Sequence, residues 1–370
     1  MKYFLIAGEA SGDSHGARLI DAIKTIDSDA EFEFWGGDKM AEAASKKPNK
    51  HIRSLAFMGF VEVIKNLPTI LSNFKKIKSE IQQFAPDRLI YIDYPGFNLR
   101  LVKWAKSLGY HNTYYISPTV WAWKPERKEL IRNYVNQMLV ILPFEKKWYK
   151  QHQIEVTYIG NPVVEQVKDF KPDTNFKSKN RLGNYVLALL PGSRKQEIKS
   201  ILPVMIEASM GMEKDYDLVI AKPDFLDLEV YAQVLKQYPK TKITLIENDF
   251  YNILSIADGA LVASGTATLE TALFNVPQVV CYKTSRLNYF IAKMLVSLKF
   301  ISLVNLICET EVVRELIQSD LTKDKLTKEL MFILQMEEKD KINLYQKLRD
   351  LLHTEDSPSR LAAQLIINAS

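Results

Sequence analysis

Cysteine is scarce in this sequence, and so are long uncharged stretches. The only thiols among the 370 residues belong to Cys281 and Cys308, too few for a disulfide framework or a zinc cage and typical of a protein from a reducing cytoplasm. The most apolar stretch, 290–308, is interrupted by Lys293 and Lys299. Because a lysine near the middle of a bilayer costs several kcal/mol, we expect a buried or surface-lying helix there instead of a membrane span.

A strong excess of one charge is also lacking. Lysine and arginine number 49 and aspartate and glutamate 44, a net charge of +5, which does not indicate a nucleic-acid-binding protein. No cluster of histidine, cysteine and carboxylate has the spacing of a metal site, so we expect neither a metal nor another cofactor. The apolar run 3–7 is stopped by Gly8 and Glu9 and predicts a first strand, because it is too short for the core of a signal peptide.

What the sequence does contain is a regular alternation of short apolar segments and helical patterns. The segments are typical of strands buried on both faces of a parallel sheet, and they lie at 3–7, 31–35, 88–93, 112–116 and 137–142, and again at 185–190, 217–221, 242–246, 259–262 and 278–282. A polar, aperiodic segment at 168–180 separates the two series. We predict an α/β fold of two facing Rossmann-like domains with a ligand cleft between them. The expected domains are 1–167 and 168–345, and a helical tail, 346–370, packs back across them.

The loop after the first expected strand is made of small and acidic residues. It offers four candidate ligand contacts, Glu9, Ser11, Gly12 and Asp13. The spacing of the dinucleotide fingerprint is absent, and two carboxylates suit a hydroxyl-rich partner such as a sugar better than a pyrophosphate. A cap on the following helix would explain the same residues, and the two roles can coexist.

Two further loops follow strands of the first domain. Asp93 ends the segment 88–93, where ligands of open α/β sheets collect, and its carboxylate could accept a proton from an attacking hydroxyl or only shape the turn at Pro95 and Gly96. Ser117 and Trp121 follow the next strand. Aromatic residues there could stack on sugar rings or line an acyl groove, or simply pack in the core.

An anion site is indicated in the second domain. Gly192, Ser193 and Arg194 form a turn that opens a helix, and a cation at a helix N-terminus is unfavourable unless it binds an anion. Arginine grips a diphosphate bidentately, although a solvated surface helix is the alternative. A second turn of small hydroxyl residues opens a later helix, and a loop asparagine follows further on; the candidates are Ser264, Gly265, Thr266, Glu270 and Asn305. Simple helix capping is again the alternative, and Glu315 is expected at the surface.

The segment 55–78 is apolar and ends in basic residues. It could lie in a membrane interface or form a pair of core helices. The expected membrane-facing residues are Phe60, Val63, Ile64, Leu67, Ile70, Leu71 and Phe74.

These motifs together resemble the lipid-A-disaccharide synthase family. The resemblance rests on Gly8-Glu9-Ala10-Ser11-Gly12-Asp13, Met58-Gly59-Phe60-Val61-Glu62-Val63, Ile92-Asp93-Tyr94-Pro95-Gly96-Phe97-Asn98, Ser117-Pro118-Thr119-Val120-Trp121-Ala122-Trp123, Leu142-Pro143-Phe144-Glu145, Leu189-Leu190-Pro191-Gly192-Ser193-Arg194 and Ala263-Ser264-Gly265-Thr266-Ala267-Thr268-Leu269-Glu270. They occur in order over roughly residues 3–318. Where the family often has a second aspartate this chain has Gly96, which leaves Asp93 as the one carboxylate of its motif.

The resemblance implies an inverting, metal-independent glycosyltransferase of the GT-B fold. The donor would be UDP-2,3-diacylglucosamine, held by the second domain, and the acceptor 2,3-diacylglucosamine 1-phosphate, held by the first. Attack of the acceptor 6-hydroxyl, with Asp93 as general base, would give UDP and the β-1,6 disaccharide of lipid A. The implied location is cytoplasmic, peripherally associated with the inner membrane, and a homodimer stays open.

Two other functions are compatible with the same residues. One is a UDP-sugar epimerase, which would need no lipid-facing surface. The other is a membrane-associated protein that binds a sugar nucleotide without turnover, which the presence of Asp93 and Arg194 disfavours.

Overall fold

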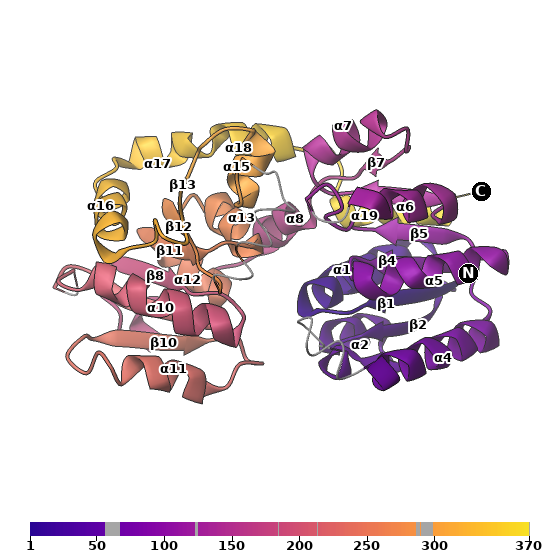
Figure 1. Cartoon of the computed structure of the whole chain (residues 1–370), viewed down its shortest axis with the longest axis horizontal. Coiled ribbons are helices and arrows are strands. Elements are labelled where there is room, and N and C mark those ends of the chain that lie inside the picture. The colour runs from indigo at the N-terminus through magenta and orange to yellow at the C-terminus, as the bar shows by residue number, and fades with distance from the viewer. Residues whose placement is uncertain are drawn as a thin grey trace. The chain divides into compact units, whose positions relative to one another are not determined.

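The computed structural model describes residues 1–55, 67–122, 125–183, 185–212, 214–285, 289 and 299–369. The chain divides into two compact units, each built on its own sheet (Figure 1). The first unit comprises Met1–Pro162 and Thr354–Ser370, and the second comprises Val163–His353. The boundary predicted after residue 167 thus lies after Pro162 in the structure, and the tail is shared: 346–353 belong to the second unit and Thr354–Ser370 to the first.

The first unit is a seven-stranded parallel sheet of order β3-β2-β1-β4-β5-β6-β7. Its strands are β1 (Lys2–Ala7), β2 (Glu31–Gly36), β3 (Lys50–His51), β4 (Arg88–Ile92), β5 (Asn112–Tyr115), β6 (Gln137–Val140) and β7 (Thr157–Tyr158). Its helices are α1 (Ala10–Ile26), α2 (Asp38–Ala44), η1 (Ile52–Ser54), α4 (Leu67–Phe84), α5 (Pro95–Ser107), η2 (Pro125–Arg127), α6 (Lys128–Tyr134), α7 (Pro143–Gln151) and α19 (Pro358–Ile367).

Both faces of this sheet are covered by helices. Alternate side chains of each strand point to opposite faces, so Phe4 and Ile6 join a core with α4, α5, α6 and α7, and Tyr3 and Leu5 join one with α1, α2 and α19. The C-terminal helix α19 is fixed to the strands as well, because Arg88 Nε donates to the Ile366 carbonyl at 3.0 Å. The last helix of the chain is therefore part of the first unit.

The second unit is a six-stranded parallel sheet of order β10-β9-β8-β11-β12-β13. Its strands are β8 (Val186–Leu190), β9 (Asp217–Lys222), β10 (Ile243–Glu247), β11 (Gly259–Ala263), β12 (Gln278–Tyr282) and β13 (Arg314–Ile317). Its helices are α8 (Pro162–Asp169), α9 (Phe176–Lys179), α10 (Lys195–Ser209), α11 (Leu228–Leu235), α12 (Phe250–Ile256), α13 (Thr266–Leu273), α15 (Leu303–Cys308), α16 (Lys323–Leu334), α17 (Glu338–Leu344) and α18 (Gln346–Leu352).

Two parallel α/β sheets confirm the predicted fold class. In a parallel sheet every strand ends at the same edge, so the loops that follow neighbouring strands are brought together. In the first unit these are the loops after β1, β4, β5 and β6, and in the second those after β8, β11 and β12. Among the described residues, no helix has the length and apolarity required to cross a bilayer.

Candidate active site

Asp93 lies in a strained turn at the carboxyl end of β4. Asp93 and Tyr94 both have left-handed backbones, with φ of 45° and 49°, a conformation that is costly for residues other than glycine and is held only where surrounding contacts enforce it. The Asp93 carbonyl accepts hydrogen bonds from the Tyr114 hydroxyl at 2.6 Å and from Asn98 Nδ2 at 2.9 Å. These two side chains, to which the sequence analysis gave no role in shaping the turn, fix the turn that presents the aspartate.

The environment of Asp93 favours its protonated form. Burial and, to a smaller extent, the neighbouring Glu9 carboxylate raise the pKa of this carboxyl, and the Tyr94 amide lowers it; the net result is a pKa of about 7. A general base works best when its pKa is close to the working pH. Groups whose pKa is shifted by burial and by a specific neighbouring charge are concentrated at functional sites, so Asp93 is a candidate for the general base.

The loop after β1 packs directly against the turn of Asp93. A Cβ on Gly8 would lie 2.3 Å from Cγ of the Tyr94 ring, so only glycine leaves room for that ring. Gly12 is buried where α1 approaches β1, with a hypothetical Cβ 3.2 Å from Ala7 Cβ. The structure thus brings together the two loops that the sequence analysis chose independently.

The four candidates in the first loop face different ways. Glu9 and Ser11 are exposed at the carboxyl edge of the sheet. Asp13 is buried, and its carboxylate accepts the backbone amides of Gly37 at 2.6 Å and of Lys39 and Met40 at 3.1 Å each. Its acceptors are therefore directed at the start of α2, whereas the sequence analysis expected a ligand contact or a cap on the helix that directly follows the loop.

A buried glutamate joins the loops after β5 and β6. Glu145 is 1% exposed; its Oε1 accepts Trp121 Nε1–H at 3.1 Å, and its Oε2 accepts the amides of Ile141 at 3.2 Å and Leu142 at 2.9 Å. Burial raises its pKa to about 7.

Ser117 lies in the same loop as Trp121, with its Oγ 2.7 Å from the Tyr149 hydroxyl. Glu145 was overlooked as a functional residue, although Pro143 at the first helical position and a glutamate at the third mark a capping box.

We expect the raised pKa of Asp93 to make the stability of the protein pH-dependent. The unfolded carboxyl titrates near pH 3.8 and the folded one near 7, so its contribution is fully present below about pH 4 and is lost as the pH rises through 7. Asp93→Asn cannot ionise and should match the wild type at pH 4 but exceed it at pH 8 by on the order of 4 kcal/mol. Urea unfolding at both pH values measures this, and an equal difference at the two would contradict it.

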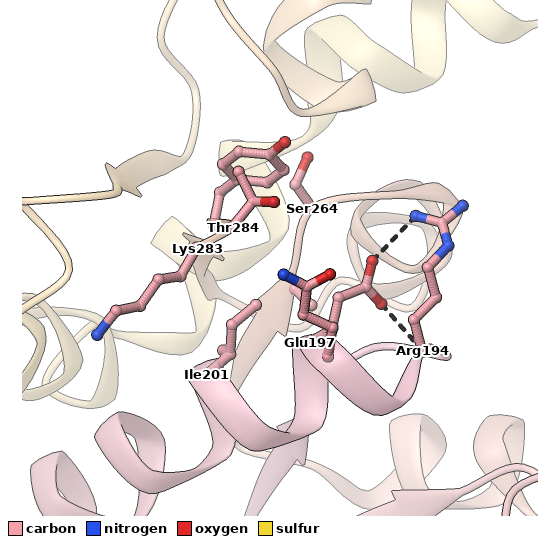
Figure 2. Close-up of a pocket in the computed structure, with 9 residues that line it drawn as sticks. Arg194, Glu197, Ile201, Ser264, Lys283 and Thr284 are labelled. Atoms are coloured by element: carbon pink, nitrogen blue, oxygen red, sulfur yellow. Dashed lines mark hydrogen bonds and ion pairs between the residues drawn. The ribbon is translucent and has the colours of Figure 1, made fainter. Parts of the chain in front are cut away.

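In the second unit, a pocket of about 220 Å³ lies at the carboxyl edge of the sheet (Figure 2). Its lining comes from the start of α10, the end of β11 and the end of β12 with the loop that follows: Arg194, Gln196, Glu197, Ile201, Ala263, Ser264, Tyr282, Lys283 and Thr284. Two of the predicted ligand residues, Arg194 and Ser264, therefore line one pocket although 70 positions separate them in the sequence (264 minus 194).

Glu197, which the sequence analysis did not select, organises the turn before α10. One carboxylate oxygen accepts the amides of Ser193 at 3.1 Å and Arg194 at 3.2 Å, and the other accepts Arg194 Nη1 at 3.0 Å. Gly192 has φ of +101°, and a Cβ there would lie 2.3 Å from the Glu197 Oε2. Glycine is thus required both by the backbone and by the carboxylate beside it. The sequence signal that could have identified Glu197 is a glutamate at the third position of the helix, as in a capping box.

Gly265, Thr266 and Glu270, which were predicted together with Ser264, are not part of the lining of this pocket. Ser264 donates its hydroxyl to the Ile301 carbonyl at 3.0 Å. Gly265 and Thr266 are exposed at the start of α13. Glu270 accepts the Tyr251 hydroxyl at 2.9 Å.

Asn305 is fully buried inside the unit. Its Oδ1 accepts the amides of Val312 at 2.7 Å and Val313 at 2.9 Å, and its Nδ2 donates to Glu315 at 2.9 Å. Glu315, expected at the surface, is only half-buried, but its carboxylate is not free in solvent, because it also accepts the amides of Ile301 and Ser302. Asn305 and Glu315 therefore hold the loop at Ile301, whose carbonyl accepts the Ser264 hydroxyl.

The residues predicted to face a membrane are only partly described. Phe60, Val63 and Ile64 lie outside the described residues, as does the side chain of Leu67 at the start of α4. Ile70 is half-buried and Leu71 is 61% exposed. The prediction is wrong for Phe74, whose ring stacks on the buried Phe97 with centroids 4.2 Å apart. The helical pattern could not separate the face that packs on the sheet from the face that meets solvent.

Solved structures with the same architecture show that the chain has the GT-B fold. It is similar to a putative UDP-N-acetylglucosamine 2-epimerase from Listeria monocytogenes, with a TM-score of 0.68 and 16% identity over 99% of this chain and 94% of the other. It is also similar to the glycotransferase of kitacinnamycin, with a TM-score of 0.61 and 14% identity over 99% and 97% of the two chains. Likeness at this identity shows the fold alone.

Sequence relatives establish the family. Residues 3–368 match the family model described as lipid-A-disaccharide synthetase. Lipid-A-disaccharide synthase from Nitrosococcus oceani is 37% identical over 94% of this chain and 91% of its own length. The enzyme of the same name from Myxococcus xanthus is 36% identical over 89% and 87%. The chain belongs to this family of glycosyltransferases, and it acts in lipid A biosynthesis.

Proposed function

We propose that the chain transfers diacylglucosamine from UDP-2,3-diacylglucosamine to the 6-hydroxyl of 2,3-diacylglucosamine 1-phosphate, which releases UDP and forms a β-1,6 disaccharide. The observation that carries the proposal is the position of Asp93, at the carboxyl end of β4 with a pKa of about 7, in a chain that matches the family over residues 3–368. Glu9, Ser11, Ser117 and Trp121 are the proposed acceptor contacts of the first unit.

Asp93 is proposed as the general base. As the acceptor hydroxyl attacks the anomeric carbon, its proton passes to the carboxylate, which must therefore be ionised before each turnover. The bond between the anomeric carbon and the diphosphate breaks as the new glycosidic bond forms, so the configuration at that carbon inverts. A base with a pKa near 7 is ionised often enough to act and basic enough to accept the proton.

The second unit is proposed to hold the UDP part of the donor. Gly192, Ser193 and Arg194 offer backbone amides and a guanidinium to the diphosphate at the start of α10, which is how helix N-termini bind phosphate groups. Negative charge that develops on the leaving UDP is stabilised by the same groups, so we propose that no metal ion is needed. Ser264, Gly265, Thr266 and Glu270 are proposed to complete the nucleotide site.

Incubation of the purified protein with both diacyl substrates tests the function. We expect UDP and disaccharide to appear in equal amounts, measured by chromatography and mass spectrometry. An epimerase would change the donor without consuming the acceptor, and a binding protein would leave both substrates intact. The fold is shared with epimerases, so this experiment separates the activities that the fold does not.

The exposed face of α4 is proposed to meet the cytoplasmic face of a membrane, where both acylated substrates reside. Leu71, Lys75 and Lys76 are exposed on this helix. An apolar side chain at a bilayer interface and lysines near anionic lipid act together, at about 1 kcal/mol per lysine.

Replacing Leu71 with Ser and Lys75 with Gln should lower affinity for anionic phospholipid vesicles by about tenfold or more. Leu228→Ser provides a matched control, because Leu228 is 60% exposed in the second unit. Co-sedimentation with vesicles gives the result. Equal binding by the double variant and the control would place the lipid-facing surface elsewhere.

A further inference from the structure

The groups proposed to receive the diphosphate already hold an anion of the protein itself. The Glu197 carboxylate accepts both amides of the turn, those of Ser193 and Arg194, and also the Arg194 guanidinium. Figure 2 shows its side chain directed back at Arg194 from the first turn of α10, with both residues on the wall of the pocket. These hydrogen bonds are the ones that a phosphate group would make.

We propose that Glu197 is a displaceable internal anion that sets the affinity of the donor site for a nucleoside diphosphate. Its carboxylate occupies the turn while the site is empty and leaves it when the diphosphate binds. The inference rests on the proposed function, because it assumes that the pocket at Arg194 takes the diphosphate of the donor and of the product UDP.

The two anions compete because they need the same donors. Each backbone amide has one hydrogen to give, and the Ser193 and Arg194 amides both give theirs to Glu197 Oε2. The carboxylate also fills the space beside Gly192, where even a Cβ would lie 2.3 Å from it. Close contact between two negative charges is unfavourable, so a phosphate can take the amides only if Glu197 moves away.

Glu197 can leave the turn without leaving an unpaired charge in the protein interior. Its side chain is 24% exposed and that of Arg194 is 61% exposed, so a rotation of either carries it into water. Arg194 and Glu197 are three positions apart, and surface ion pairs of this spacing contribute little to stability. The exchange therefore trades one set of hydrogen bonds for another, and the carboxylate lowers the net affinity for the incoming anion.

A site arranged in this way binds UDP less tightly than its donors would allow. The occupied turn keeps the amides at the start of α10 satisfied when no ligand is present. After transfer, the returning carboxylate competes with UDP and favours its release. Glu197 would thus set the balance between donor binding and product release.

The change Glu197→Gln tests the inference. Glutamine retains an oxygen that can cap the helix but loses the charge, so the Kd for UDP should fall by about tenfold in calorimetric titration. Affinity for uridine, which has no phosphate, should not change. Glu311→Gln is the matched control, since Glu311 pairs with Arg314 at 3.0 Å in the same spacing and unit.

Unchanged or weaker UDP binding by Glu197→Gln would overturn the inference and assign Glu197 a purely structural role. If that variant does not fold, Glu197→Asp replaces it, because a carboxylate one methylene shorter reaches the amides less well. Tighter UDP binding by Glu197→Asp supports the inference, and weaker binding overturns it. If wild-type protein does not bind UDP, the proposed function of the pocket fails instead. The two failures are therefore distinguishable.

Discussion

Asp93→Asn is expected to reduce turnover by about 100-fold or more while the affinity for UDP stays unchanged. The amide cannot accept the proton of the acceptor hydroxyl, but it is close in size to the carboxylate and keeps the turn between β4 and α5. The turn itself is held through the Asp93 carbonyl by Tyr114 and Asn98, contacts that the substitution does not touch.

The pH profile gives this variant a second signature. Because the pKa of Asp93 is raised to about 7, kcat/KM of the wild type should rise with pH up to about 7 and then level off, as the base loses its proton. In Asp93→Asn this limb should disappear. Glu129→Gln, an exposed carboxylate of α6 paired with Arg132, is the control and should keep both rate and profile. Near-normal turnover in Asp93→Asn would dismiss the assignment of the base.

Arg194→Ala is expected to cost roughly 2–4 kcal/mol of transition-state stabilisation, measured as kcat/KM. The guanidinium is proposed to meet the diphosphate as charge develops on the leaving UDP. Arg194→Lys should recover only part of the loss, because an ammonium group lacks the planar fork that binds two phosphate oxygens at once. Wild-type activity should persist in the presence of a chelator, since the amides and Arg194 supply the stabilisation.

The matched control for this variant is Arg314→Ala. Arg314 is an exposed arginine of the same unit that is also paired with a glutamate three positions away, and its loss should leave kcat/KM within about twofold. A similar decrease in both variants would mean that the charge of the unit matters and not the position of Arg194. Abolition of wild-type activity by the chelator would contradict the metal-free mechanism.

The fold was predictable because its signals are local. Runs such as 89–92 and 186–190 are apolar without interruption, as is typical of strands covered on both faces, and parallel sheets then place Asp93 and Arg194 just after strand ends. The family resemblance added the substrates, which no pattern of residues specifies by itself.

The parts that were missed depend on tertiary contacts. Glu145 and Glu197 look like ordinary helix-capping residues in the sequence, and only the structure shows that their carboxylates also bind Trp121 and Arg194. Asn305 and Glu315 are polar residues beside a loop, yet they face inward because their hydrogen bonds close that loop. Phe74 belongs to an amphipathic helix, and its place on the buried face is shown only by its stacking on Phe97.

The configuration and position of the new glycosidic bond test the central claim most directly. NMR spectroscopy of the disaccharide made by the purified protein from UDP-2,3-diacylglucosamine and 2,3-diacylglucosamine 1-phosphate shows both at once. Attack by the 6-hydroxyl with Asp93 as base predicts a β linkage to carbon 6, with one UDP released per disaccharide. An α linkage, a bond to another hydroxyl, or UDP released without any disaccharide would contradict the mechanism.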